Sequence, residues 1–200
     1  VTDIERTNKF LNYRDTVFNA ERKALIPAER INNYDKVKVR AEDVILFAGL
    51  LARTKFVGIS LPYDLKIIEQ YGSSVTLFNQ SNDLRLKEQI IPSFNKIFSK
   101  AFREGFNSED LKRGYLRAVL LHELAHSYLH YRNAAKNLQD LFPYIDELAA
   151  TILGLRMAGP LLLKDRITNK QLESMIVSFL CRSFSHIKAT KASKSLPYYS

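Results

Sequence analysis

The chain has 200 residues, a hydrophobic content of 46% and a formal net charge of +9 at pH 7. Its single cysteine, Cys181, excludes an intramolecular disulfide framework. The longest apolar stretch, Val44 to Leu51, is much shorter than the roughly 20 residues that span a bilayer. No apolar run follows a basic start, so no signal peptide is expected. We therefore predict one soluble, cytoplasmic domain over residues 1–200.

The N-terminal third is predicted to be mainly helical. A capping pattern at Thr2 to Glu5 begins a helix that runs to about Ala24, and Pro27 ends it. A second helix is expected over residues 41–52, although residues 44–51 alone could form a buried strand. Residues 1–73 could form an N-terminal helical extension of the domain.

Two strands are predicted in the next part of the chain, over residues 56–61 and 74–78. We expect residues 74–78 to form an edge strand that pairs with an extended substrate. Residues 84–106 have apolar positions at helical spacing, interrupted at Pro92, and a basic outer face. We interpret this segment as a helix packed on the core; binding of residues 91–102 to a membrane surface is the alternative.

The segment His122-Glu123-Leu124-Ala125-His126 contains the residue types that zinc-dependent hydrolysis needs. In a helix with about 3.6 residues per turn, His122 and His126 lie on the same face and can bind one ion. Glu123 follows His122 around the helix and is placed to act on a water molecule as a general base. The apolar flanks predict a buried helix over residues 116–131. Two imidazoles and a carboxylate without a partner would be costly to bury there.

A catalytic zinc site requires a third protein ligand. An H-E-x-x-H-x-x-G-x-x-H site is excluded because the chain has Leu129 and Arg132 at the required glycine and histidine positions. His130 is rotated too far around the helix, so we expect it to make a supporting or surface contact. Glu147 follows His126 at a spacing typical of gluzincins, the thermolysin-like metallopeptidases. We predict Glu147 as the third ligand, with Asp146 as the alternative.

The motif and its downstream helix together resemble the ImmA/IrrE-type metallopeptidases. The resemblance rests on the segment from His122 to His130, on Glu147-Leu148-Ala149-Ala150 and on Pro160, and it covers about residues 115–162. Ala125 replaces the usual glycine of that family. The resemblance implies a small zinc peptidase that often cuts a regulatory protein.

The C-terminal part is predicted to contain two helices. Pro143 begins the helix that includes Glu147, and Gly159-Pro160 ends it. A capping box at Thr168 to Gln171 begins a last helix that ends near Phe184. Residues 188–200, rich in Lys, Ser and Ala, are expected to form a mobile basic tail. The fold class is therefore α+β: a mostly helical, zincin-like fold with a small sheet packed on the helix that contains His122.

These elements predict a gluzincin-type zinc metalloendopeptidase that hydrolyses a protein or peptide substrate. Zn²⁺ bound by His122, His126 and Glu147 would activate a water molecule, and Glu123 would accept its proton. Tyr144, Tyr128 and His186 are the candidates for stabilising the developing oxyanion. Because the net charge is +9, nucleic acid is a further candidate partner. A SprT-like protease acting on DNA-bound proteins is therefore one alternative, and a latent basic binding module with a zinc site is another.

Overall fold

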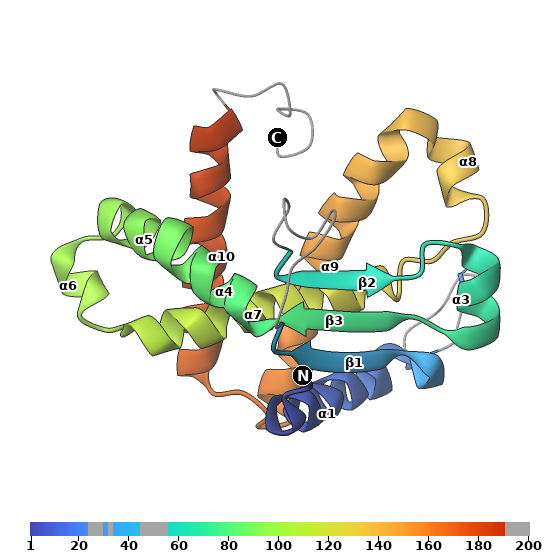
Figure 1. The fold of residues 1–200 in the computed structure, drawn as a ribbon, viewed down its shortest axis with the longest axis horizontal. Helices are drawn as coiled ribbons and strands as arrows, with labels where there is room; N and C mark the ends of the chain where they lie inside the picture. Colours follow the sequence, from blue (N-terminus) through green and yellow to red (C-terminus); the bar gives the residue numbers. More distant parts are fainter. Residues whose placement is uncertain (24–29, 32–33, 45–55, 191–200) are drawn as a thin grey trace.

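The computed structural model describes residues 1–23, 30–31, 34–44 and 56–190, with side chains up to residue 185 (Figure 1). The strands are β1 (Lys38–Glu42), β2 (Gly58–Leu61) and β3 (Ser74–Phe78). The helices are α1 (Ile4–Glu21), α3 (Leu65–Tyr71), α4 (Asn79–Arg85), α5 (Ile91–Ile97), α6 (Lys100–Arg103), α7 (Ser108–His126), α8 (Ala134–Leu138), α9 (Phe142–Leu163) and α10 (Asn169–Thr190). Short turns of helix cover Tyr34–Lys36, Leu86–Ile90 and Gln139–Leu141. The described part of the chain is thus mostly helical with one small sheet, as the predicted α+β class requires.

The sheet formed by the described strands has the order β1-β3-β2. β3 pairs parallel with β1, with Val39 opposite Val75, and antiparallel with β2, with Gly58 opposite Leu77. β3 is therefore the central strand, so the prediction that residues 74–78 form an edge strand was wrong. Val75 and Leu77 are fully buried, whereas the alternating Ser74, Thr76 and Phe78 are only partly covered.

β1 lies where the sequence analysis predicted no strand. Lys38 and Arg40 are exposed, and the alternating Val39 and Ala41 are buried. This alternation of buried and exposed side chains is that of a half-buried strand. The predicted helix or strand over residues 41–52 lies mostly outside the described residues, which resume at residue 56.

Helix α7 is the element against which the rest of the fold packs. It crosses behind the sheet, and both α9 and α10 cross it (Figure 1). Asn107 and Asp110 form a capping box that begins the helix at Ser108, earlier than the predicted start near Leu116. The helix ends at His126 rather than near Tyr131. Its apolar side chains Leu120, Leu121 and Leu124 are fully buried.

Pro143 lies in the first turn of α9, as predicted, whereas Pro160 and Pro92 have different effects from those predicted. Helix α9 continues through Pro160 to Leu163 instead of ending there. Pro160 removes one helical hydrogen bond, but Ala158 and Leu161 on either side of it are buried in the core, which offsets that loss. Pro92 lies in the first turn of α5, directly after a π-helical turn, and does not break the chain direction. The segment instead ends at Phe98, whose backbone is extended.

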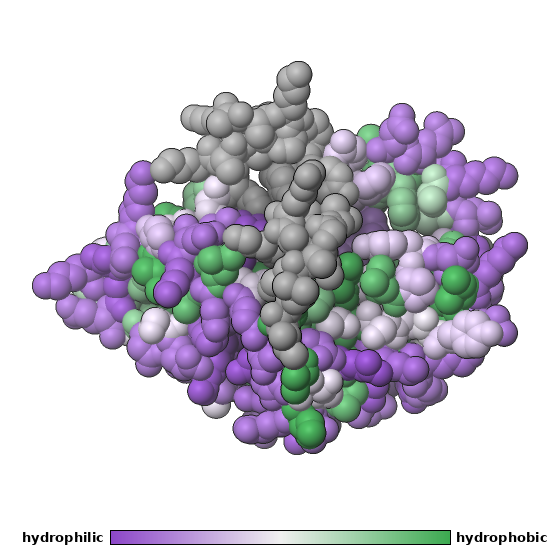
Figure 2. All heavy atoms as spheres, in the orientation of Figure 1, coloured by the Kyte–Doolittle hydropathy of each residue, from purple (hydrophilic) through white to green (hydrophobic). Residues whose placement is uncertain are grey.

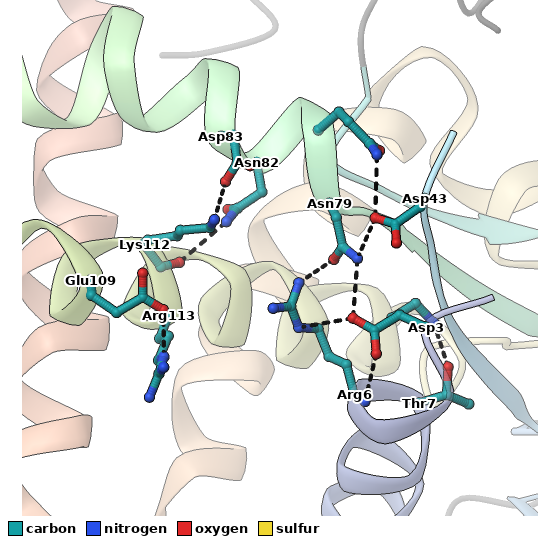
Figure 3. A network of polar contacts seen from close by, with 12 residues as sticks. Asp3, Arg6, Thr7, Asp43, Asn79, Asn82, Asp83, Glu109, Lys112 and Arg113 are labelled. Carbon is teal, nitrogen blue, oxygen red and sulfur yellow. Dashed lines mark hydrogen bonds and ion pairs between the residues drawn. The ribbon is translucent and has the colours of Figure 1, made fainter. Parts of the chain in front are cut away.

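A polar network connects the start of α1 with the start of α4 (Figure 3). Asp3 caps α1 by accepting a hydrogen bond from the Arg6 backbone N–H at 3.0 Å. The Asn79 amide donates to Asp43 at 2.9 Å and to Asp3 at 3.3 Å, and it accepts a bond from Arg6. These contacts hold the N-terminal helix against the end of the sheet.

Apolar side chains also reach the surface of the molecule. Leu61 at the end of β2 and Ile67 in α3 are exposed, and the face shown in Figure 2 has apolar residues gathered over the sheet region. Within the described residues, no helix combines the length and the apolar character needed to cross a membrane.

The contact between α7 and α10 depends on Gly114. A Cβ atom there would lie 2.3 Å from the Ser174 carbonyl oxygen and 2.9 Å from the Met175 backbone nitrogen. Because backbone atoms cannot move aside, Gly114→Ala should lower the free energy of unfolding by about 2 kcal/mol or more. Gly159→Ala is the matched control, since a Cβ at Gly159 would have no atom within 4 Å. Its effect should stay within about 1 kcal/mol in the same denaturant titration. Equal losses in both variants would contradict this account of the packing.

Candidate metal centre

The two histidines of the motif converge on one point. His122 and His126 lie one turn apart on α7, with their Nε2 atoms 3.2 Å apart and their rings at 88° to each other. Two nitrogen ligands at about 2.0–2.1 Å from a tetrahedral zinc ion are separated by about 3.4 Å. The imidazoles therefore already have nearly the spacing of two ligands to one ion.

Helix α9 adds Glu147 to this pair. Its Oε2 atom lies 3.2 Å from His122 Nε2, and its Oε1 atom lies 3.6 Å from His126 Nε2. The ligand atoms of these three residues all lie within 4.8 Å of one another. Two imidazole nitrogens and one carboxylate oxygen form a donor set that suits zinc and leaves its fourth position open. The structure thus brings together the three residues that the sequence analysis predicted as ligands.

Small residues on α9 allow this approach. Ala150 is fully buried, and a Cβ atom at Gly154 would lie only 3.0 Å from the backbone nitrogen of His122. The two helix backbones are therefore almost in contact at His122, two turns along α9 from Glu147. Glu147 is on the same face of α9 and reaches His122 directly as a result.

Two further side chains hold the outer nitrogens of the histidine rings. Asp146 Oδ2 lies 3.0 Å from Nδ1 of His126, and Thr151 Oγ1 lies 3.3 Å from Nδ1 of His122. When each Nδ1–H donates to its oxygen, the Nε2 lone pairs are free to bind a metal. Asp146 is therefore a partner of His126 rather than the alternative ligand. The sequence analysis missed Thr151, although its spacing of four residues from Glu147 places both on one helix face.

The surroundings of the site lower the pKa of Glu147 and raise the pKa of His126. The hydrogen bond from His122 is the main cause that lowers the pKa of Glu147; burial opposes it, and the nearby imidazoles add to it. Burial alone would lower the pKa of His126, but the hydrogen bond and charge of Asp146, helped by Glu123 and Glu147, raise it. The site is thus already organised to hold positive charge.

Glu123 lies between this cluster and strand β2. Burial raises the pKa of its carboxyl group, and the backbone N–H of Ser60 donates a hydrogen bond to it, which partly opposes that rise. A Cβ atom at Gly58 would lie 2.9 Å from Cγ of Glu123. Only glycine at this point of β2 leaves the Glu123 side chain its place beside the histidines.

The three candidates for oxyanion stabilisation have different positions. Tyr128 is fully buried and packs against Phe18 and Tyr34, with ring centroids 4.7 and 4.5 Å away, so it is a core residue and that hypothesis is corrected. Tyr144 lies on α9, one turn before Glu147, with 39% of its surface exposed. The side chain of His186 lies outside the described residues.

No family model and no curated protein matches the chain. Solved structures with a similar fold include two dipeptidyl-peptidases III. The dipeptidyl-peptidase III of Caldithrix abyssi is 17% identical with a TM-score of 0.77, over 99% of this chain and 38% of that protein. The dipeptidyl-peptidase III of Corallococcus sp. strain EGB is 18% identical with a TM-score of 0.77, over 92% of this chain and 36% of that protein. The chain therefore shares their fold and spans little more than a third of their length. The resemblance to the ImmA/IrrE family stays a prediction.

The contact between Asp146 and His126 generates a test of metal binding. Asp146→Asn removes the carboxylate that orients the ring and increases its basicity, so the zinc affinity should fall roughly 10–100-fold. Competition with a chromophoric chelator measures this affinity. Asp140→Asn is the control, because Asp140 is exposed in the turn before α9 and lies outside the cluster. An unchanged affinity in Asp146→Asn would show that this contact does not support the ligand.

His130 generates a separate prediction about stability. It is not among the clustered ligands, and burial lowers its pKa from 6.5 to about 4. The unfolded chain therefore binds a proton between these pH values that the folded protein does not bind. Stability should fall by up to about 3 kcal/mol as the pH drops from 6.5 toward 4. Denaturant unfolding of metal-free protein at several pH values measures this loss. His130→Asn should show a shallower pH dependence than the wild type, and identical curves would contradict the prediction.

Proposed function

We propose that this chain is a zinc-dependent peptidase of the gluzincin type, with His122, His126 and Glu147 as ligands and Glu123 as general base. The observation that carries the proposal is the cluster of ligand atoms formed by two helices. The two Nε2 atoms lie 3.2 Å apart, and the oxygens of the Glu147 carboxylate lie 3.2 Å from His122 Nε2 and 3.6 Å from His126 Nε2. Three protein ligands and an open position are typical of catalytic rather than structural zinc sites. A zinc ion bound there would lower the pKa of water and polarise a carbonyl group.

The environment of Glu123 supports its role in proton transfer. A residue that takes a proton from the attacking water and delivers it to the leaving amine works best with a pKa near the working pH. Burial raises the pKa of Glu123 in that direction, whereas the pKa of Glu147 is lowered, as suits a ligand. Glu123 also packs against β2, where a Cβ atom at Gly58 would lie 2.9 Å from its Cγ atom, and the Ser60 backbone donates a hydrogen bond to its carboxylate.

Strand β2 takes the role that the sequence analysis assigned to residues 74–78. It lies at the edge of the sheet formed by the described strands, and its backbone contacts Glu123. An extended peptide can add to a sheet edge through main-chain hydrogen bonds. We propose that a peptide substrate lies along β2 with its scissile bond beside Glu123.

The similar fold of the two dipeptidyl-peptidase III structures supports a peptidase over a binding module. The retained Glu123 supports it too, because a structural zinc site has no use for a general base. We propose a protein or peptide as the substrate. The DNA-linked alternative rests on the net charge of +9 and requires that DNA stimulates cleavage.

Two substitutions separate catalysis from metal binding. Glu123→Gln should keep one zinc ion per chain and lower kcat/KM for peptide hydrolysis about 10²–10⁴-fold, because the general base is lost. His126→Ala should lose both zinc and activity. Metal analysis and cleavage of a mixed peptide library give the two readouts, each with and without DNA.

Glu109→Gln is the control for charge, since Glu109 lies in the first turn of α7 and pairs with Arg113 at 2.6 Å. It should retain both zinc and activity. Full activity in Glu123→Gln would show that the general base has been assigned wrongly.

A further inference from the structure

The backbone of strand β2 alternates between its partner strand and the free edge of the sheet. The Phe78 N–H donates to the Val57 carbonyl at 2.8 Å, so these two residues form a hydrogen-bonded pair at the start of the antiparallel ladder between β2 and β3. Because such pairs alternate along a ladder, the N–H and C=O groups of Gly58 and Ser60 point away from β3. Within the described residues the sheet ends at β2, so these groups lie along its free edge.

Glu123 reaches the same edge from α7. The Ser60 N–H donates a hydrogen bond to its carboxylate, and Gly58 packs against its side chain. The C=O of Ser60 and both backbone groups of Gly58 point to this edge as well, and an extended peptide can pair with groups of this kind. A peptide that pairs with β2 therefore has its main chain directly beside Glu123.

The side chains of β2 alternate between the two faces of the sheet. A Cβ atom at Gly58 would lie 2.7 Å from Cγ1 of Val119, so Gly58 and Ser60 face α7. Ile59 and Leu61 point to the opposite face, which is turned away from α7 (Figure 1). Leu61 is 41% exposed, and Ile59 is partly exposed. The outer face of β2 is therefore apolar and accessible.

An extended peptide on this edge alternates in the same way. Its side chains point in turn toward α7 and toward the outer face, and those on one face recur at every second residue. Side chains that lie opposite each other on neighbouring strands contact each other, so the outward side chains of the peptide lie beside Ile59 and Leu61. An apolar side chain gains contact with carbon atoms there, whereas a charged one loses hydration without gaining a counter-ion from these two residues.

From these observations we infer that Ile59 and Leu61 form a substrate subsite that selects apolar side chains at alternate positions of an extended peptide. Leu61, the more exposed of the two, is then a specificity-determining residue on one side of the scissile bond. This inference rests on the proposed peptidase function and adds the substrate class to it.

The test uses serine-rich peptides in which a single Leu is moved, one position at a time, past the cleaved bond. Mass spectrometry identifies the bond that is cut. With zinc-loaded wild-type protein, kcat/KM should rise up to about fivefold when Leu occupies every second position and should fall back at the positions between them. Leu61→Ser should abolish the rise at the position nearest to residue 61.

Ile67→Ser is the matched control. Ile67 is 44% exposed, close to the 41% of Leu61, but it lies on α3 rather than on β2. Because both side chains are exposed, both variants should fold. Ile67→Ser should keep the alternating preference of the wild type. A wild-type preference without alternation, or an unchanged alternation in Leu61→Ser, would overturn the inference and leave the peptidase function intact.

Equilibrium binding of the same peptides to zinc-loaded Glu123→Gln protein distinguishes the two ways of failing. If no peptide is cleaved by the wild type but binding alternates with the position of Leu and loses this alternation when Leu61→Ser is added, the inference stands and the proposed catalysis is wrong. If no peptide is cleaved and binding does not depend on the position of Leu, both are wrong.

Discussion

The close approach of two helix backbones at Gly154 is the contact on which the whole site depends. A methyl group there would meet the backbone of His122 at 3.0 Å, which is tighter than ordinary packing. Metal sites tolerate errors of only about 0.2 Å in ligand distance. A displacement of α9 away from α7 would move Glu147 away from the imidazoles, which now lie 3.2 and 3.6 Å from its oxygens. The absence of a side chain at one position thus determines whether a carboxylate on one helix can share an ion with histidines on another.

The second organising feature is the difference in environment among the three carboxylates around the histidines. Glu147, Asp146 and Glu123 all lie around the same pair of histidines, yet each has a different environment. Glu147 accepts from a ligand nitrogen, Asp146 holds the far side of a ring, and Glu123 is buried beside a strand. The pKa of Glu147 is lowered and that of Glu123 is raised because their neighbours differ, which fits the separate roles that we propose for them as ligand and general base.

The sequence predicts those features that depend on spacing within one helix. Helical spacing puts His122 and His126 on one face of α7, and the spacing of small residues along α9 lets Glu147 approach them from the second helix. The features that it misses are set by packing between distant segments. Strand order placed β3 at the centre, and burial of Ala158 and Leu161 carried α9 through Pro160. The contacts of Asp146 and Thr151 with the histidine rings could not be predicted, because the sequence does not show which faces of α7 and α9 meet. The strand at Lys38–Glu42 was not predicted because Lys38 and Arg40 were interpreted only as part of the positive surface charge, and the alternation of burial across them was not recognised.

Through the hydrogen bond from the Ser60 backbone to Glu123, strand β2 is connected with both of the proposed tasks, peptide alignment and proton transfer. The strand that we propose to align the peptide also contacts Glu123, the residue that we propose as the general base. A shift of this strand along its neighbour would misalign both at once. In the proposed enzyme, one strand would therefore position both the peptide and the general base, so a misplaced peptide and a misplaced base would occur together.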